Sequence, residues 1–371
     1  MKTSHRENLL AAFSGEATDF IPVAPNFDFW YRARTNEDSM PAQLKGLDHD
    51  DVLTKLGYAL CKGAPVASRR FREPIEFKTW REDDLTYELW KTPKGDLRRV
   101  SRQSAYDRSL GMAPQRIEYP VKDFSDYPAY IELMKHLEFT PDPDFSKFHE
   151  KEAALGENGL AYVPLSKSPG HDFMMKWTGY ENAFYHMADN KALFSEAIQT
   201  ANDAYRPLWD ILAASPCRLI VHGGNYSTAM TPPPVFKEYI LPYFKEFNTR
   251  MKDAGKLVGA HTDGDMTGLL DLYLEAGFST TNCHACAPLV NCTLEEAADK
   301  WLNKVSIWGA VPSILFEPTA TDDEFYSHLE KMLALARKGS RFIAAISDHA
   351  MPASRYERLV GMGNFFRENR I

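Results

Sequence analysis

The feature that most constrains the fold is a regular alternation of strand-like and helix-like segments in the C-terminal half of the chain. From Gly159 onward, six apolar runs of strand type each end in polar residues and lead into a helical pattern. Successive strand–helix units with short links favour a parallel α/β sheet. The six runs are residues 159–165, 218–222, 257–260, 277–282, 305–309 and 341–346, and the clearest helical segments of the chain are residues 6–15, 180–213, 269–274, 293–302 and 321–337.

The number of strands decides between a closed barrel and an open sheet. Residues 19–26 have the pattern of a first strand, and one further strand, which the sequence does not locate, brings the count to eight. Barrels of eight strand–helix units reach a length of 371 residues when they carry insertions. We therefore predict one (β/α)8 TIM barrel domain over residues 1–371.

An inserted segment interrupts the N-terminal half of this pattern. Residues 87–100 alternate in polarity around a Pro-Lys-Gly-Asp turn, which is typical of a β-hairpin. A hairpin does not belong in a strand–helix repeat. We expect residues 73–126 to form an inserted hairpin region or a lid over the barrel.

Composition excludes several classes of function. A net charge of −8 argues against nucleic acid or an anionic membrane as the main partner. No apolar run approaches the roughly 18 residues of a membrane-spanning helix, and the N-terminus lacks an apolar signal region, so we expect a cytoplasmic protein. The absence of a Gly-x-Gly-x-x-Gly fingerprint and of a Walker loop argues against dinucleotide and nucleotide binding.

Histidines and acidic residues gather just beyond the predicted strands. Five histidines occupy such positions, and carboxylates accompany them. In a barrel the carboxyl ends of the strands form one face, where active sites are built. This gathering predicts a metal site, although each histidine taken alone also fits a hydrogen-bonded structural role. The residues are His171, His222, His261, His284 and His349, together with Asp263, Asp265, Cys286 and Asp348.

Side-chain alternation suggests which of these residues point into the mouth of the barrel. In an extended chain, positions two apart share a face, so His261 and Asp263 point the same way. By the same rule His284 and Cys286 share a face, and whether either binds the metal stays open. Imidazole and carboxylate ligands suit zinc, and an open coordination position would indicate a catalytic ion. Asp263 or Asp265 could instead cap the following helix, and Asp265 lies nearer to its start.

Several segments distributed over most of the chain carry a family resemblance. They are residues 6–16 followed by 21–23, the Pro-rich residues 231–236 ahead of 241–242, residues 255–264, residues 308–312 and the closing residues 342–343. On these segments the chain resembles the uroporphyrinogen decarboxylase superfamily and, within it, the corrinoid-dependent methyltransferases. The resemblance implies a (β/α)8 barrel.

Two departures from the family pattern narrow the function that the resemblance implies. The decarboxylases carry an arginine-rich segment after the first strand, whereas this chain has the aromatic residues 26–31 there, so we do not expect porphyrinogen decarboxylation. Thiol-activating methyltransferases place His-x-Cys after the fifth strand and a further Cys after the eighth. The matching positions here are His261, Asp263 and Asp348, and the exchange of thiolates for carboxylates favours an oxygen substrate.

The resemblance then implies transfer of a methyl group from a methyl ether, commonly a methoxylated aromatic compound, to the cobalt of a corrinoid. No Asp-x-His-x-x-Gly cobalamin motif is present, which implies a separate corrinoid protein as partner. A zinc ion on His261, Asp263 and Asp348 would activate the ether oxygen. The proton donors would come from His222, His284 and His349. The aromatic residues among the predicted substrate-binding residues fit ordinary packing in the core equally well. The predicted substrate-binding residues are Phe27, Asp28, Trp30, Tyr31, Asn225 and Trp308, with Phe29 beside them.

Two alternative functions remain at this stage. A metal-independent decarboxylase of a smaller or tetrapyrrole-like acid would need a cluster of basic residues at the mouth, where the sequence offers Lys167 and Arg32. A binding protein or an inactive barrel would use the same pocket only to capture a ligand.

Overall fold

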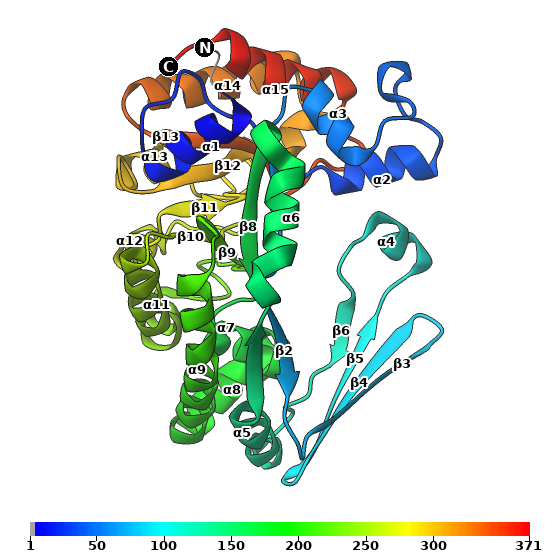
Figure 1. Ribbon diagram of the computed structural model, residues 1–371, viewed down its shortest axis with the longest axis vertical. Helices are drawn as coiled ribbons and strands as arrows, with labels where there is room; N and C mark the ends of the chain where they lie inside the picture. Colours follow the sequence, from blue (N-terminus) through cyan, green and yellow to red (C-terminus); the bar gives the residue numbers. More distant parts are fainter. Residues whose placement is uncertain (1–3) are drawn as a thin grey trace.

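A computed structural model describes residues 4–371 of the chain. Its centre is a curled, parallel seven-stranded sheet with helices packed on the outside (Figure 1). The strand order β1-β8-β9-β10-β11-β12-β13 follows the sequence, as in a TIM-like barrel. The strands are β1 (Leu60–Gly63), β8 (Gly159–Leu165), β9 (Leu219–His222), β10 (Leu257–His261), β11 (Thr280–Asn282), β12 (Ser306–Pro312) and β13 (Arg341–Ser347).

The segment predicted as the first strand, residues 19–26, is reduced to a single bridge between Val23 and Ala344. The N–H of Ala24 donates to the carbonyl of Ala344 at 2.9 Å, and the N–H of Ala59 donates to the carbonyl of Val23 at 2.7 Å. The segment therefore joins β13 to the residue that precedes β1 and links the two edges of the sheet. A regular ladder does not form because proline, which lacks an N–H, flanks the bridge at Pro22 and Pro25.

Helix α1 (His5–Ser14) covers the amino end of the sheet. A Ser4/Glu7 capping box starts this helix, and a left-handed Gly15 ends it. Its apolar face packs into the sheet interior, where the ring of Phe13 lies 5.3 Å from that of Trp308. The opposite, carboxyl end of the sheet is left free for a site.

The remaining helices surround the sheet or lie in the connections. Helices on the outside bury apolar faces against the strands, as expected for an α/β fold. Across residues 4–371, no helix combines the length and the apolar character needed to cross a bilayer. The helices are α2 (Asp28–Asn36), α3 (His49–Lys55), α4 (Ala105–Leu110), α5 (Tyr127–Lys135), α6 (Ser146–Leu155), α7 (Pro169–Asp172), α8 (Tyr180–Asp189), α9 (Lys191–Ala214), α10 (Pro233–Val235), α11 (Leu241–Asp253), α12 (Leu270–Glu275), α13 (Leu294–Lys300), α14 (Asp322–Arg337) and α15 (Tyr356–Glu368).

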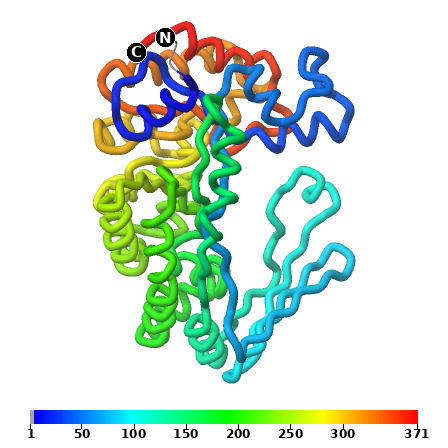
Figure 2. The backbone as a smooth tube through the Cα atoms, in the orientation of Figure 1, coloured from blue at the N-terminus to red at the C-terminus, as the bar shows by residue number. Residues whose placement is uncertain are grey.

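Two antiparallel sheets interrupt the barrel between β1 and β8. β2 (Ala67–Phe71) pairs with β7 (Leu137–Pro141) and extends away from the barrel. β3 (Glu76–Glu82), β4 (Leu85–Thr92), β5 (Gly95–Arg102) and β6 (Gln115–Glu118) form a four-stranded sheet, in which β4 and β5 pair around Pro93 and Lys94. Figure 2 shows this sheet standing beside the body of the molecule. A lid function for it stays a prediction.

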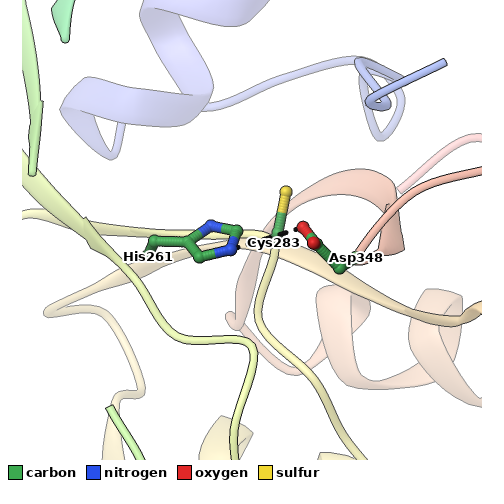
Figure 3. Close-up of side chains that lie close together, drawn as sticks. All are labelled: His261, Cys283 and Asp348. Atoms are coloured by element: carbon green, nitrogen blue, oxygen red, sulfur yellow. Dashed lines mark ion pairs between the residues drawn. The ribbon is translucent and has the colours of Figure 1, made fainter. Parts of the chain in front are cut away.

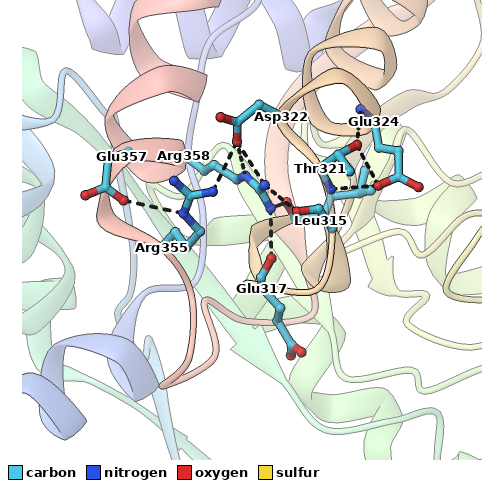
Figure 4. A network of polar contacts seen from close by, with 9 residues as sticks. Leu315, Glu317, Thr321, Asp322, Glu324, Arg355, Glu357 and Arg358 are labelled. Atoms are coloured by element: carbon cyan, nitrogen blue, oxygen red, sulfur yellow. Dashed lines mark hydrogen bonds and ion pairs between the residues drawn. The ribbon is translucent and has the colours of Figure 1, made fainter.

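One buried arginine fastens the C-terminal helix to the rest of the barrel. Arg358 on α15 is only 2% exposed, and its guanidinium donates to the carbonyls of Leu315 and Glu317, each at 2.8 Å. It also donates to the carboxylate of Asp322, at the start of α14, at 2.9 Å (Figure 4). A buried charge is tolerated when its donors are satisfied in this way. The network therefore couples α14, α15 and the loop that follows β12.

Candidate metal centre

Three potential metal ligands from different strand ends meet at the carboxyl side of the sheet. His261 ends β10, Cys283 follows β11 directly, and Asp348 follows β13 directly. The Nε2, Sγ and carboxylate oxygen atoms of these residues lie within 4.8 Å of one another (Figure 3). His261 is placed opposite Asn282 by the parallel register of β10 and β11, which brings the next residue, Cys283, beside the imidazole.

Neutral amides orient two of these ligands. The Nδ1 of His261 lies 2.9 Å from the Oδ1 of Asn282, which fixes the proton on Nδ1 and turns Nε2 toward the cluster. The Nδ2 of Asn26 lies 2.9 Å from the Sγ of Cys283 and also contacts the carbonyl of Asp348. The imidazole and the thiol are therefore held in place from outside the cluster.

Asp263 lies beside the three-ligand group, next to His261. Its Oδ2 is 3.5 Å from the Nε2 of His261 and accepts a hydrogen bond from the Nδ2 of Asn225 at 2.7 Å. Asn225 in turn accepts a hydrogen bond from the ammonium of Lys167 at 2.7 Å. Asp263 was predicted as a ligand, whereas the group of closely spaced donors in residues 4–371 has Cys283 in its place.

The electrostatics of the cluster favour a charged His261 and a charged Asp263 when no metal is present. Burial alone would lower the pKa of His261, but Asp263 and Cys283 outweigh it and raise the pKa well above its ordinary value. Burial would raise the pKa of Asp263, but His261 and Asn225 lower it overall. Burial raises the pKa of the Cys283 thiol to about 11, against the opposing effect of His261.

Cys283 was not predicted, because the alternation rule pointed to His284 and Cys286 instead. The backbone of Cys283 has φ of 51°, in the left-handed region, so the chain is not extended there and the alternation fails. His284 is consequently buried against Trp301, and Cys286 is buried with its thiol 3.4 Å from the carbonyl of Ala310. The position of Cys283 as the first residue after a strand, shared with Asp348, is the sequence signal that could have indicated it.

The predicted proton donors separate into two buried histidines and one at the cluster. Burial lowers the pKa of His284 to about 3 and that of His222 to about 4, so both are neutral. The Nδ1 of His222 lies 2.9 Å from the carbonyl of Ser166, away from the three ligands. His349 alone of the three predicted donors lies at the cluster, with its Nε2 3.8 Å from Asp348. His171, the remaining histidine of the predicted group, is fully buried and bonds to the hydroxyl of Tyr180.

Most of the predicted aromatic substrate-binding residues belong to the core. Phe27, Trp30 and Trp308 are at most 2% exposed. The indole N–H groups donate to backbone carbonyls, from Trp30 to Ser354 and from Trp308 to Ala24. These rings therefore fill space and satisfy their polar atoms internally, as buried tryptophan generally does.

Residues around the first predicted strand end have different roles from those expected. The segment that follows it forms helix α2, which leaves Asp28 exposed, 3.9 Å from His49. The hydroxyl of Tyr31 donates to the carbonyl of Leu47. Of the aromatic residues in this segment, Phe29 reaches the cluster, because its ring stacks on His349 at 4.1 Å.

Asp265 braces two loops rather than a helix. Its Oδ1 accepts hydrogen bonds from the backbone N–H groups of Thr267 and Cys292. Helix α12 begins only at Leu270, beyond the reach of this carboxylate. The expectation that Asp265 caps the helix is therefore wrong, and it stabilises the turn before the helix instead.

The three-ligand group fits a zinc ion. Nitrogen, sulfur and carboxylate oxygen are the usual zinc donors, and three protein ligands leave a fourth position open, as in catalytic sites. The Oδ1 of Asp348 is buried and accepts no hydrogen bond, although the Nε2 of His261 lies 3.3 Å away. The close neighbour of this oxygen is the imidazole of His261, which is protonated when no metal is present, so this position favours a cation.

Comparisons with known proteins agree with this architecture. A family model described as uroporphyrinogen decarboxylase (URO-D) matches residues 173–368, which is more than half of the chain. Among solved structures, a methyltransferase from Methanosarcina mazei superposes with a TM-score of 0.58 at 11% identity, covering 99% of each chain. A putative vitamin-B12-independent methionine synthase from Listeria monocytogenes gives a TM-score of 0.39 at 11% identity, covering 94% of this chain and 95% of that one. Only the first likeness has a TM-score high enough to be informative, and at 11% identity it concerns the fold alone. No curated protein sequence gives a significant match.

Proposed function

The chain belongs to the uroporphyrinogen decarboxylase family, and from this membership and the geometry of its barrel mouth we propose that it is a methyltransferase. The proposed reaction moves a methyl group from a methyl ether, of a methoxylated aromatic compound, to the cobalt of a separate corrinoid protein. The observation that carries the proposal is the group of His261, Cys283 and Asp348 at the strand ends. The shared fold with a methyltransferase supports the same class of reaction.

Removing a methyl group from an ether requires help for the oxygen that is left behind. An alkoxide or phenoxide is a poor leaving group unless a Lewis acid or a proton stabilises its developing charge. Zinc, when bound, supplies Lewis-acid chemistry to that oxygen. His261, Cys283 and Asp348 would hold the ion, and Asn282 and Asn26 would keep the imidazole and the thiol in place.

His349 is the proposed proton donor for the oxygen that loses the methyl group. Burial lowers its pKa overall, and the charge of Asp348 offsets only part of this effect. Its ring plane is fixed by stacking on Phe29. In the proposal, His349 donates a proton to the oxygen of the demethylated product, and Phe29 forms part of the surface that faces an aromatic substrate.

The candidate metal ligands include a thiol as well as a carboxylate, so the expectation of an oxygen substrate has to rest on the share of oxygen ligands at the site. The sequence led us to expect the carboxylates of Asp263 and Asp348 beside His261 and left a role for Cys286 or His284 open, whereas the structure adds the thiol of Cys283. Asp348 stays in the group, and Asp263 is ionised next to it. Two carboxylates around one thiol give the site more hard oxygen character than a two-thiolate site, which supports the ether oxygen as the target.

The charge of the mouth disfavours the decarboxylase alternative. An acidic substrate would meet the carboxylates of Asp263 and Asp348 at the centre of the site. Of the two basic residues that the alternative offers, Lys167 is hydrogen-bonded to Asn225, the partner of Asp263, and Arg32 lies against Gly111 in the inserted region. Like charges at short distance would weaken the binding of a carboxylate substrate.

The test is a reconstituted reaction with a reduced corrinoid protein and a panel of methoxylated aromatic compounds. We expect the absorbance of methyl-cobalt to appear with at least one donor, and the rate to fall by about 100-fold or more in His261→Ala, because the ion loses an orienting ligand. Absence of methyl-cobalt with every donor and with every corrinoid protein tested, in protein that contains zinc, would overturn the methyl-ether proposal.

A further inference from the structure

A cleft separate from the metal centre lies between the inserted sheet and the side of the barrel. Its volume is about 690 Å³, within the range of small-molecule sites. One wall is a single face of the β3–β6 sheet, and the other is formed by β2, α5, α9 and the segment after β8. None of the three metal-ligand candidates contributes to its lining.

The cleft is positively charged, in contrast to the whole molecule. Five cationic side chains and two carboxylates line it, whereas the net charge of the chain is −8. Three of the cations have acidic partners: Arg99 pairs with Glu88, Lys176 with Asp172, and Arg70 with Glu138. The two that remain are Arg69 and Arg116.

Among the five cations of the cleft, Arg116 has the fewest interactions that offset its charge. Within residues 4–371 its guanidinium forms no hydrogen bond and no ion pair, and the side chain is half-buried. Burial and the nearby charge of Arg99 both lower its pKa, against weaker opposing effects from Asp172 and Glu88. Arg69, on the opposite wall, donates only to the neutral hydroxyl of Tyr205. A partly desolvated guanidinium without a partner is stabilised by an anion, and its planar donors suit a carboxylate or a related oxyanion.

Aromatic rings form a further part of the cleft lining. Trp90 on β4 lies between two other rings, 5.2 Å from Phe77 and 5.1 Å from Trp177. Trp177 in turn lies 5.1 Å from Tyr130 on α5. Phe77 is 49% exposed, although it lines the cleft, so a ligand ring could cover it. Aromatic faces of this kind bind flat rings by stacking and edge contacts.

We infer that this cleft binds a small aromatic anion, with its ring against the exposed Phe77 and its carboxylate or other oxyanion on the guanidinium of Arg116. Arg69 faces the same space from β2 and adds attraction for the anion. The inference does not depend on zinc or on methyl transfer, because the cleft and the metal centre share no residue.

Calorimetric titration of the full chain with 2-naphthoate tests the inference. We expect binding of 2-naphthoate, and weaker binding by about tenfold or more for neutral 2-naphthamide and for the non-aromatic cyclohexanecarboxylate. Arg116→Gln should weaken 2-naphthoate binding by at least about tenfold, because the charged hydrogen bonds are lost. Phe77→Ala should also weaken it, by a smaller factor.

Matched variants separate the cleft from other sites. Arg102→Gln removes a cation on β5 that follows Ser101, the register partner of Arg116, and that pairs with Asp84. Trp80→Ala removes an aromatic residue of β3 outside the cleft. Both should bind 2-naphthoate as the wild type does, as should His261→Ala. Equal binding of 2-naphthoate and 2-naphthamide, an unchanged affinity in Arg116→Gln, or loss of binding in His261→Ala would each overturn the inference. Thermal unfolding of each variant establishes that it is folded.

Discussion

At the scale of single residues, uncharged amides organise the barrel mouth. Asn282 holds the imidazole of His261, Asn225 holds the carboxylate of Asp263, and Asn26 contacts the thiol of Cys283. A neutral amide can orient a ligand without neutralising its charge. The metal donors are therefore positioned in advance, and their lone pairs stay directed toward the centre of the cluster.

The first prediction concerns Asn282. Asn282→Ala should weaken zinc binding by about 10- to 100-fold, since the imidazole of His261 loses its orienting acceptor. Asn282→Asp keeps an acceptor at the same place and should stay within a few-fold of the wild type. Competition with a chromogenic chelator measures both affinities. Equal affinity of Asn282→Ala and the wild type would show that Asn282 has no such role.

The second prediction concerns pH. The pKa of His261 is raised in the metal-free protein, and that of the Cys283 thiol is raised to about 11. Both groups must lose a proton to bind zinc, so binding releases protons and the affinity should rise as pH increases from 6 to 8. Titrations in buffers with different ionisation enthalpies give the number of protons released. Affinity that does not change with pH would contradict the proposed ligands.

Two of the predicted ligands could be found from the sequence because strand ends are readable there. His261 and Asp348 follow apolar strand-like runs, and the structure places both in the cluster. Cys283 was missed because its place depends on a positive φ, which the sequence does not reveal for a residue other than glycine. The mistaken roles of His284 and Trp308 have a related cause, since a polar or aromatic residue near a strand end can equally well be buried.

At the scale of elements, hydrophobic runs bounded by polar residues predicted the strands of the C-terminal half. β8 coincides with the predicted residues 159–165, and β9 to β13 lie close to their predicted ranges. The first strand was overestimated because prolines interrupt its hydrogen bonding. β1 was not located because Leu60–Gly63 is short and contains Lys62, so it has no apolar pattern to recognise.

The third prediction, at this scale, concerns the connection between α14 and α15. Arg358→Met should lower the free energy of unfolding by about 3–5 kcal/mol, because buried carbonyls and Asp322 lose their donor. The control is Arg355→Met, which removes a partly exposed partner of the same Asp322 and should cost less than about 1 kcal/mol. Denaturant titration measures both changes. A similar cost for the two variants would contradict the structural role of Arg358.

At the scale of the whole molecule, the inserted sheet adds a second functional surface to the barrel. The sequence predicted an insertion over residues 73–126. It did not predict the cleft, which depends on contacts such as that of Trp90 with Trp177 between segments far apart in the chain. Local sequence patterns indicate helices and strands. The packing of one element on another depends on contacts between residues that are far apart in the sequence, and a short sequence segment does not contain them.

The most direct test of the central claim is zinc X-ray absorption spectroscopy on protein purified without chelators. The account predicts about one zinc ion per chain with one sulfur neighbour near 2.3 Å and the remaining neighbours nitrogen or oxygen. The sulfur signal should disappear in Cys283→Ser and persist in Cys286→Ser, because only the first thiol faces His261 and Asp348. Protein that binds no zinc, or zinc whose sulfur neighbour survives in Cys283→Ser, would contradict the proposed metal centre.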